Sequence, residues 1–247
     1  TIGLCEELKP KLVIAYSRRF GISADMMANL TTCLGSLSTT LQEMITAYGV
    51  FANQGRLVKP IYILRVEDQA GNTLESSLPE FKQVTSEETA FLLSNVLQDV
   101  VQTGTGRRAR AIGRPSAGKT GTTNDSVDAW YIGYIPQLLT GVYVGFDKPR
   151  RMGRSETGSR AAAPIWIDFM KNAVTNLPTE QFKQPPGITT VKIHKSGRRA
   201  IPCDNVKEIK EEHYKTGTEP VLDLARSGRC GQTVTEKTER EESKPEL

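Results

Sequence analysis

Apolar residues recur at helical spacing in four stretches of the chain. These stretches begin at Pro10, after Thr40, after Thr85 and at Pro164, and the first three stop at Gly21, Gly55 and Gly104. Thr40 and Glu43 have the spacing of a capping box, in which each side chain bonds the other residue's backbone, and Thr85 and Glu88 repeat it. The pattern therefore predicts four helices that each bury one face in a core.

Shorter apolar runs between these helices predict strands. Ile61–Val66 leads into a turn at 69–72, and Trp130–Ile135 is followed by Leu139–Phe146 across a short link at Pro136. The second pair is typical of an antiparallel hairpin. Helices on both sides of a short antiparallel sheet indicate an α+β fold.

The composition of the chain changes near Pro178. We expect residues 1–177 to form the main unit, residues 178–230 a small appended module with a strand at Thr190–His194, and residues 231–247 a disordered, charged tail. Hydrophobic residues make up 38% of the 247 and charged residues 24%, which is a globular composition. No apolar stretch approaches the roughly 20 residues that a bilayer span needs.

The net charge excludes few functions, but the basic residues form two clusters along the sequence. The formal net charge of +4 is too small to predict nucleic-acid binding. Basic residues gather in two stretches: Arg107, Arg108, Arg110, Arg114 and Lys119, then Lys148, Arg150, Arg151 and Arg154. Such clusters attract anionic substrates or lipid headgroups, and two solvated loops explain them equally well. The chain opens on Thr1 without a signal-peptide pattern, so we expect part of a longer product.

The four cysteines form no metal-binding pattern. None stands in a CxxC pair, and the two histidines lie far from ligand spacing, so no zinc site is expected. Cys5 and Cys33 stand beside apolar residues and are predicted to be buried small hydrophobes. Cys203 and Cys230 lie in a polar, loop-rich region, where a disulfide is the usual stabiliser in an oxidising compartment.

Lys119 fits three motifs. Gly113, Gly118, Lys119 and Thr120 match the phosphate loop GxxxxGK[ST], but the flanks lack the preceding strand and following helix that phosphate binding needs. Ser116 and Lys119 match SxxK, the spacing of a serine nucleophile and its lysine on one helix face. The surrounding glycines and proline make a helix costly here, which argues against a nucleophilic Ser116.

The third motif, KTG at Lys119, Thr120 and Gly121 followed by Thr122, fits a strand at the edge of a sheet. Gly121 lets a substrate backbone approach closely, and a lysine with neighbouring hydroxyls suits an extended peptide that carries a carboxylate. The same letters recur at 215–218, where Pro220 and the polar surroundings favour a loop or turn.

Residues around KTG resemble the transpeptidase domain of class A penicillin-binding proteins, the bifunctional peptidoglycan synthases. The resemblance rests on Ala117–Thr123, Asp128–Tyr134 and Gly141–Asp147, with support from Leu34–Ser36, Ala47-Tyr48, Phe51–Asn53, Gly104–Gly106 and Ala163–Trp166. It extends from near Thr1 to Pro220, where the last part is similar to the family's C-terminal extension. Agreement at so many separate places is far more specific than KTG alone.

The resemblance implies a penicillin-binding, serine β-lactamase-like transpeptidase fold, of which this chain would hold the C-terminal part. It implies a peptidoglycan D,D-transpeptidase that forms an acyl-enzyme and binds stem peptides and β-lactams, with no cofactor and no metal. Lys119 would support the site electrostatically. Thr120 and Thr122 would receive the carboxylate, beside Gly121, and the Thr122 N–H would be one oxyanion donor. Asp128, Trp130 and Tyr131 are expected to serve mainly in packing.

The family's other two motifs are missing from these 247 residues. SxxK occurs only at Ser116, and no Ser-x-Asn occurs. The family places both motifs upstream, so we expect this chain alone to be inactive and its parent to be the enzyme. Membrane association is expected only through that upstream part, on the periplasmic face of the bacterial inner membrane, a setting that permits a Cys203–Cys230 disulfide.

Two other functions remain open at this stage. A D,D-carboxypeptidase or β-lactamase-like serine hydrolase would use water as the acceptor, and KTG is common to both classes. A non-catalytic carboxylate-binding module would use the same strand without any nucleophile. The residues outside KTG favour the synthase.

Overall fold

The computed structural model describes residues 1–224, 227 and 230, and the predicted tail at 231–247 lies outside the described residues. The chain divides into two compact units, residues 1–183 and residues 184 onward. The helices of the first unit are α1 (Ile2–Leu8), α2 (Pro10–Arg19), α3 (Leu41–Ala52), α4 (Glu87–Gln102) and α5 (Ala163–Ala173). Short helical turns are η1 (Thr32–Leu34), η2 (Arg107–Ile112), η3 (Asn124–Ser126) and η4 (Gly158–Ala162).

A three-stranded antiparallel sheet is the centre of the first unit. Its strands are β5 (Ala117–Thr122), β6 (Ala129–Ile135) and β7 (Leu138–Val144), in that order. β6 and β7 form the hairpin that the sequence predicts, with Ile135 opposite Leu138 at the turn. Among the described residues, β5 therefore lies at one edge of this sheet.

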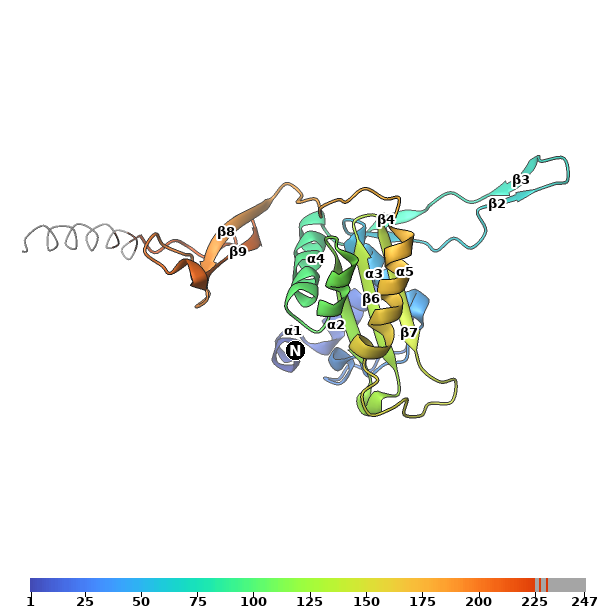
Figure 1. The fold of residues 1–247 in the computed structure, drawn as a ribbon, viewed down its shortest axis with the longest axis horizontal. Helices are drawn as coiled ribbons and strands as arrows, with labels where there is room; N and C mark the ends of the chain where they lie inside the picture. Colours follow the sequence, from blue (N-terminus) through green and yellow to red (C-terminus); the bar gives the residue numbers. More distant parts are fainter. Residues whose placement is uncertain (225–226, 228–229, 231–247) are drawn as a thin grey trace, which may run out of the picture. The chain divides into compact units, whose positions relative to one another are not determined.

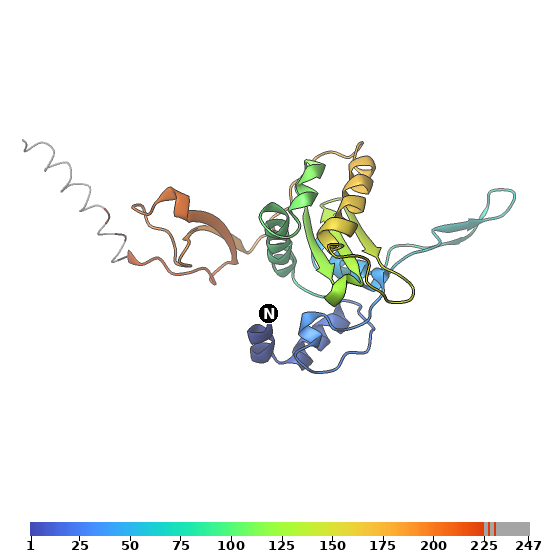
Figure 2. The same cartoon turned by 60° about the horizontal axis from the view of Figure 1, so that its bottom comes forward.

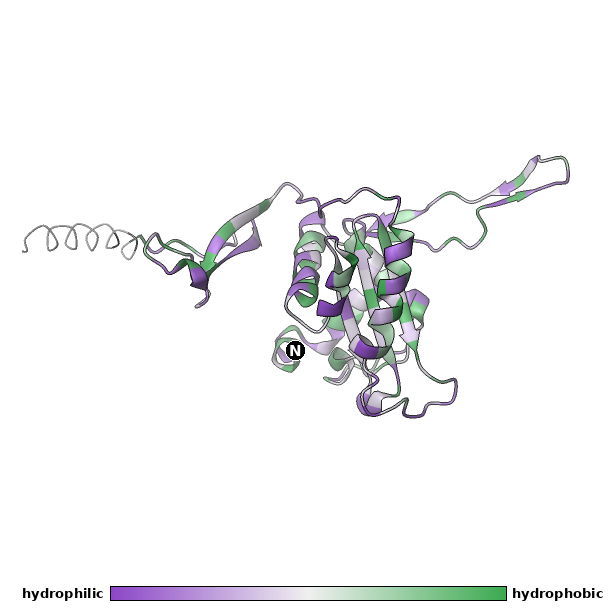
Figure 3. Ribbon diagram, viewed as in Figure 1, coloured by the Kyte–Doolittle hydropathy of each residue, from purple (hydrophilic) through white to green (hydrophobic). Residues whose placement is uncertain are grey.

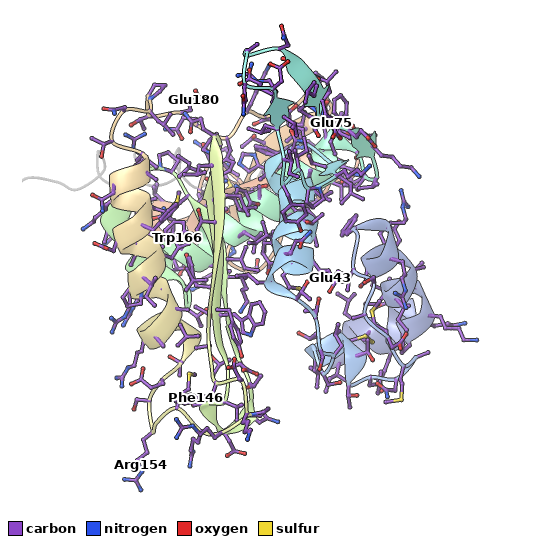
Figure 4. The ribbon with its side chains drawn as sticks, turned by 90° about the vertical axis from the view of Figure 1, so that its right-hand side faces the viewer. Glu43, Glu75, Phe146, Arg154, Trp166 and Glu180 are labelled. Atoms are coloured by element: carbon purple, nitrogen blue, oxygen red, sulfur yellow. A yellow bond between two sulfur atoms is a disulfide. The ribbon has the colours of Figure 1, made fainter. Side chains whose placement is uncertain are left out.

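Helices cover both faces of the sheet (Figures 1 and 2). A Cβ added at Gly133 of β6 would stand 2.8 Å from Trp166 of α5, whereas one at Gly141 of β7 would stand 2.8 Å from Ile45 of α3. Figure 4 shows Trp166 between α5 and the sheet, where it is fully buried. This arrangement is the α+β fold that the pattern predicts.

The four predicted helices form, but α2 contains no buried residue, so the prediction that it buries one face is wrong, and one predicted cap is wrong as well. Thr40 and Glu43 make the complete capping box of α3. At α4, however, the capping residue is Ser86, whose Oγ accepts a hydrogen bond from the Thr89 N–H. The Thr85 N–H instead bonds the carbonyl of Gly55, so strand pairing holds Thr85 and the helix begins one residue later.

The strand predicted at Ile61–Val66 is also largely wrong. Only β2 (Arg65–Glu67) pairs, with β3 (Thr73–Ser76), while β1 (Arg56–Val58) pairs with β4 (Phe81–Gln83). The predicted turn between β2 and β3 is present, because the Asp68 carboxylate accepts from the backbone of Ala70 and Asn72. Figure 3 shows apolar stretches along the segment between β1 and β4, which carries β2 and β3. Its apolar residues Tyr62, Ile63, Leu64, Leu74 and Leu78 are all exposed.

Both pairs of cysteines form disulfides. Cys5 of α1 is bonded to Cys33 of η1, so the prediction that they are free, buried hydrophobes is wrong, although Cys5 is buried. Cys203 and Cys230 form the second disulfide, as the sequence suggested. The first bond joins residues 28 positions apart in the sequence, a contact that the periodicity of apolar residues does not reveal.

The second unit is a two-stranded hairpin with its own small core. Its strands are β8 (Ile188–His194) and β9 (Ile209–Lys215), which pair antiparallel, and the short turn η5 (Val206–Glu208) precedes β9. The second KTG-like stretch follows β9 as a turn at Thr216 and Gly217. In the described part of the chain, no helix has the length and apolar character to cross a bilayer, and no group of His, Cys, Asp or Glu side chains is arranged to hold a metal ion.

Candidate functional site

The KTG residues lie on the edge strand β5, as the sequence predicts. Gly118 is buried where a Cβ would stand 2.6 Å from the hydroxyl of Tyr131, so only glycine lets β5 approach β6 at this point. Alternation then places Lys119 and Gly121 on the face covered by α3, and Thr120 on the face of Tyr131. The Lys119 ammonium donates to the carbonyl of Thr120 over 2.7 Å.

The two threonine hydroxyls are held by segments from elsewhere in the chain. Thr120 Oγ1 lies 2.8 Å from Thr105 Oγ1, in the loop that follows α4. Thr122 Oγ1 accepts a hydrogen bond of 3.0 Å from the backbone N–H of Gly158, at the start of η4. Because an N–H occupies one acceptor position of Thr122, its own hydroxyl proton is left to donate to a ligand.

Gly158 approaches β5 and β6 very closely. A Cβ at this position would stand 2.4 Å from the Trp130 carbonyl and 2.5 Å from the Gly121 carbonyl. No side chain fits there, and glycine alone lets the N–H reach Thr122. This contact fixes the end of β5 without using a side chain, which is why the spacing of motifs in the sequence does not disclose it.

A groove of about 860 Å³ runs along the α3 face of β5. Lys119 to Thr123 form one side, and Met44 and Tyr48 of α3 with residues 34–41 form the other. Ser36, Ser38 and Thr39 add hydroxyls to that second wall, and sequence reasoning did not identify them as site residues. Burial raises the pKa of Tyr48, so its hydroxyl keeps its proton at neutral pH.

Asp128, Trp130 and Tyr143 also line the groove. The Tyr143 hydroxyl donates to Asp128 Oδ1 over 2.8 Å, and this bond raises the pKa of Tyr143. The rings of Trp130 and Tyr143 lie 4.8 Å apart. Trp130 and Tyr143 are opposite each other in the strand register, so strand alternation is the signal that brings them to one face.

Tyr131, by contrast, is fully buried on the other face, against Trp166. Its role in packing agrees with the expectation from the sequence. Trp130 and Asp128 do not serve packing alone, because both also line the groove. Successive residues of β6 therefore alternate between the groove, which Trp130 lines, and the packed face, where Tyr131 is buried.

The other two motifs at Lys119 lack the structure that their chemistry needs. Ser116 is 1% exposed and precedes the strand β5, so it shares no helix with Lys119. Gly113 ends the short helix η2, and a strand rather than a helix follows Gly118. Neither a serine–lysine pair on one helix face nor a phosphate loop is therefore formed here.

The family comparison agrees with this geometry. Residues 18–171 match the family described as "Penicillin binding protein transpeptidase domain". The chain therefore belongs to the penicillin-binding protein transpeptidase family.

Individual relatives extend the match. Penicillin-binding protein 1A of Aquifex aeolicus is 35% identical over 219 residues, which cover 89% of this chain and 30% of that protein. Penicillin-binding protein 1A of Neisseria lactamica is 39% identical over 180 residues, covering 70% of this chain and 23% of that protein. The chain thus spans less than a third of these two curated relatives.

Solved structures share the fold. The crystal structure of penicillin-binding protein 1A from Haemophilus influenzae superposes with a TM-score of 0.82 at 30% identity, covering 90% of this chain and 38% of that one. PonA1 from Mycobacterium tuberculosis, in complex with penicillin V, gives a TM-score of 0.61 at 25% identity, covering 71% and 53%.

Proposed function

We propose that this chain supplies the carboxylate-binding half of a peptidoglycan D,D-transpeptidase site. Lys119 and the hydroxyls of Thr120 and Thr122 receive the terminal carboxylate of a stem peptide or a β-lactam, and Gly121 gives the ligand backbone room. The Thr122 N–H serves as one oxyanion donor. The observation that carries the proposal is the edge strand β5, with its lysine and two fixed hydroxyls along an open groove.

The nucleophile in this proposal comes from outside the 247 residues. The parent protein supplies SxxK and Ser-x-Asn, forms an acyl-enzyme with one stem peptide and passes it to an amine of another. A hydrolytic relative would transfer the acyl group to water instead, and family membership favours the synthase over that alternative. The two disulfides support an extracytoplasmic location, where thiols are oxidised.

Intact-protein mass spectrometry with benzylpenicillin tests this proposal. We expect the full-length gene product to gain one penicillin mass, and the 247-residue chain to gain none. In the full-length protein, Lys119→Ala should slow acylation at least about 100-fold, since it removes a charged group beside the reacting centre. Lys148→Ala is the matched control, because Lys148 is an exposed lysine in the loop after β7 and lies outside the groove.

Two results would contradict the proposal. Stoichiometric acylation of the 247-residue chain would place a nucleophile within it, with Ser116 the first to examine. Equal acylation rates for the Lys119→Ala and Lys148→Ala proteins would show that Lys119 has no role in the site.

A further inference from the structure

The groove has a negatively charged end as well as a positively charged one. Lys119 lies on β5, and Asp128 lies beyond the other end of the strand, where the Thr123 N–H bonds the Asp128 carbonyl over 3.1 Å. Both side chains line the same groove. A ligand that lies along β5 therefore meets opposite charges at its two ends.

Asp128 is a half-buried carboxylate with no cationic partner in the described part of the chain. None of the ion pairs formed within the described residues involves it. Tyr143 donates to Oδ1 and thereby fixes the orientation of the carboxylate, while Oδ2 has no hydrogen bond assigned to it among the described residues. Partial burial makes such an uncompensated charge costly, and a ligand cation would offset that cost.

Two aromatic residues line the groove together with this carboxylate. Trp130 and Tyr143 lie with ring centroids 4.8 Å apart at 58°, and both line the groove beside Asp128. Aromatic faces attract an ammonium group through the ring quadrupole. A carboxylate beside two aromatic rings attracts a primary ammonium group through both its charge and the ring faces, whereas a neutral polar group lacks the charge that both interactions favour.

We propose that Asp128, Trp130 and Tyr143 form a subsite for the side-chain ammonium of a diamino acid in the stem peptide. The inference rests on the proposed function, because Lys119 and the threonines must hold the peptide's carboxylate. Two basic residues of the neighbouring loop contact other partners: Arg150 lies 3.8 Å over the Phe146 ring, and Arg151 pairs with Asp125 at 4.0 Å. Asp147 adds a further negative charge near Tyr143.

The spacing of the two charges matches such a peptide. From Lys119 to Thr123 the strand advances four residues, or about 13 Å. Two residues of extended backbone cover about 7 Å, and the remaining ~6 Å is within reach of a side chain with four methylene groups. A diamino acid two positions before the terminal carboxylate therefore spans the groove from Lys119 to Asp128.

The test compares two peptides that differ only in this amine. Nα-acetyl-L-lysyl-D-alanyl-D-alanine carries a free ammonium at neutral pH, and acetylation of its Nε removes the charge. Binding to the 247-residue chain needs no nucleophile. The indole N–H signal of Trp130 reports on occupancy of the subsite, because the other tryptophan, Trp166, is fully buried and its N–H bonds Gly133 and Thr140.

We expect the free-amine peptide to bind about fivefold or more tightly than the acetylated one. Asp128→Asn should abolish that preference while keeping an acceptor for Tyr143. Asp168→Asn, an equal change of charge at an exposed position of α5, should leave the preference unchanged. The free-amine peptide should also shift the Trp130 indole signal more than the acetylated one does.

Equal affinity of the unaltered chain for the two peptides would contradict the subsite. A preference for the amine that persists in Asp128→Asn would also contradict it, as would the absence of binding by either peptide at millimolar concentration. If the two affinities are equal but both fall in Lys119→Ala, the subsite is wrong and the carboxylate site of the proposed function stands. If the preference for the amine is present and Lys119→Ala leaves both affinities unchanged, the carboxylate site of the proposed function is wrong although an ammonium site exists; if Lys119→Ala weakens both peptides by the same factor and the preference remains, both sites stand.

Discussion

At the scale of single residues, the direction of one hydrogen bond decides how Thr120 meets a ligand. Thr120 and Thr105 share a bond of 2.8 Å in which either hydroxyl is able to donate. If Thr120 donates to a bound carboxylate, its single proton is used, so Thr105 must donate to Thr120. Thr105 is then a positioning residue that leaves the Thr120 proton free to donate to the ligand.

Thr105→Val removes that donor without changing the volume of the side chain. We expect it to weaken binding of a peptide with a free terminal carboxylate by about three- to tenfold, and Thr105→Ser to restore it. The same peptide with an amidated C-terminus should respond little to either change. Titration of both peptides measures the effect.

Thr103→Val is the matched control for this experiment. Its hydroxyl bonds the Asp99 carbonyl at the end of α4 and does not line the groove. If Thr103→Val and Thr105→Val lower the affinity equally, the effect comes from the stability of the loop, and the positioning role of Thr105 is wrong.

Gly118 sets the distance between β5 and β6. Gly118→Ala places a methyl group 2.6 Å from the Tyr131 hydroxyl and 3.0 Å from the Ile132 carbonyl, so we expect a loss of about 1–3 kcal/mol in the free energy of unfolding. Removing the hydroxyl by Tyr131→Phe should recover part of that loss, and urea denaturation of the double-mutant cycle measures the coupling.

Gly49→Ala controls for the chemistry of the substitution. Gly49 lies within α3, and a Cβ there meets nothing within 4 Å outside the helix backbone, so alanine should stabilise by about 0.5–1 kcal/mol. Opposite signs at the two glycines are expected. Destabilisation of similar size at both positions would contradict the close approach of Tyr131 to Gly118.

At the scale of elements, Glu43 joins the start of α3 to the segment that precedes it. Its carboxylate accepts from the Thr40 N–H, Thr39 Oγ1, and both the N–H and the hydroxyl of Ser23. These bonds, led by the Ser23 hydroxyl, lower the pKa of Glu43 from 4.5 to about 2. Figure 4 shows Glu43 at this end of α3.

The lowered pKa makes stability depend on pH. A carboxyl whose folded pKa is depressed contributes stability above its unfolded pKa of 4.5, and that contribution is lost as pH falls from 4.5 toward 2. Glu43→Gln should remove this acid-sensitive part of the stability curve. Thermal unfolding between pH 2 and pH 6 measures it, and Glu87→Gln, in the first turn of α4, is the matched control.

Regular elements are the part of the fold that the sequence predicts well. The period of the apolar residues located α2, α3, α4 and α5, and alternation located the hairpin of β6 and β7. The predictions fail where contacts between distant parts of the chain determine the local structure. Pairing with Gly55 moves the cap of α4 from Thr85 to Ser86, and a bond between distant chain segments joins Cys5 to Cys33.

The residues of the candidate site likewise fall into those that the sequence predicts and those that only the fold brings together. The motif gave Lys119, Thr120, Gly121 and Thr122, because a local sequence pattern carries them. Thr105 and Gly158 were missed as partners of the two threonines, since they meet β5 only through the fold. Tyr143 was missed as a groove residue for the same reason.

At the scale of the whole molecule, the Cys5–Cys33 disulfide supports one wall of the groove rather than the sheet. The bond joins α1 to η1, and the groove wall at 34–41 begins directly after Cys33. Several apolar side chains of α1 and α2 contribute little to holding this region, because Leu4, Leu8 and Leu12 are exposed. The buried core lies elsewhere, around β6 and α5.

Replacing both cysteines by alanine should therefore loosen the groove wall and leave the sheet intact. Closing a loop across 28 residues is worth about 2–4 kcal/mol, and that loss should be confined to the first 35 or so residues. Hydrogen exchange should show faster exchange there, unchanged protection in β5, β6 and β7, and weaker peptide binding. Replacing Cys203 and Cys230 is the matched control, which should affect only the unit that begins at residue 184. Equal loss of protection across the sheet would mean that the bond stabilises the central core directly, and the groove wall would then owe its position to the sheet.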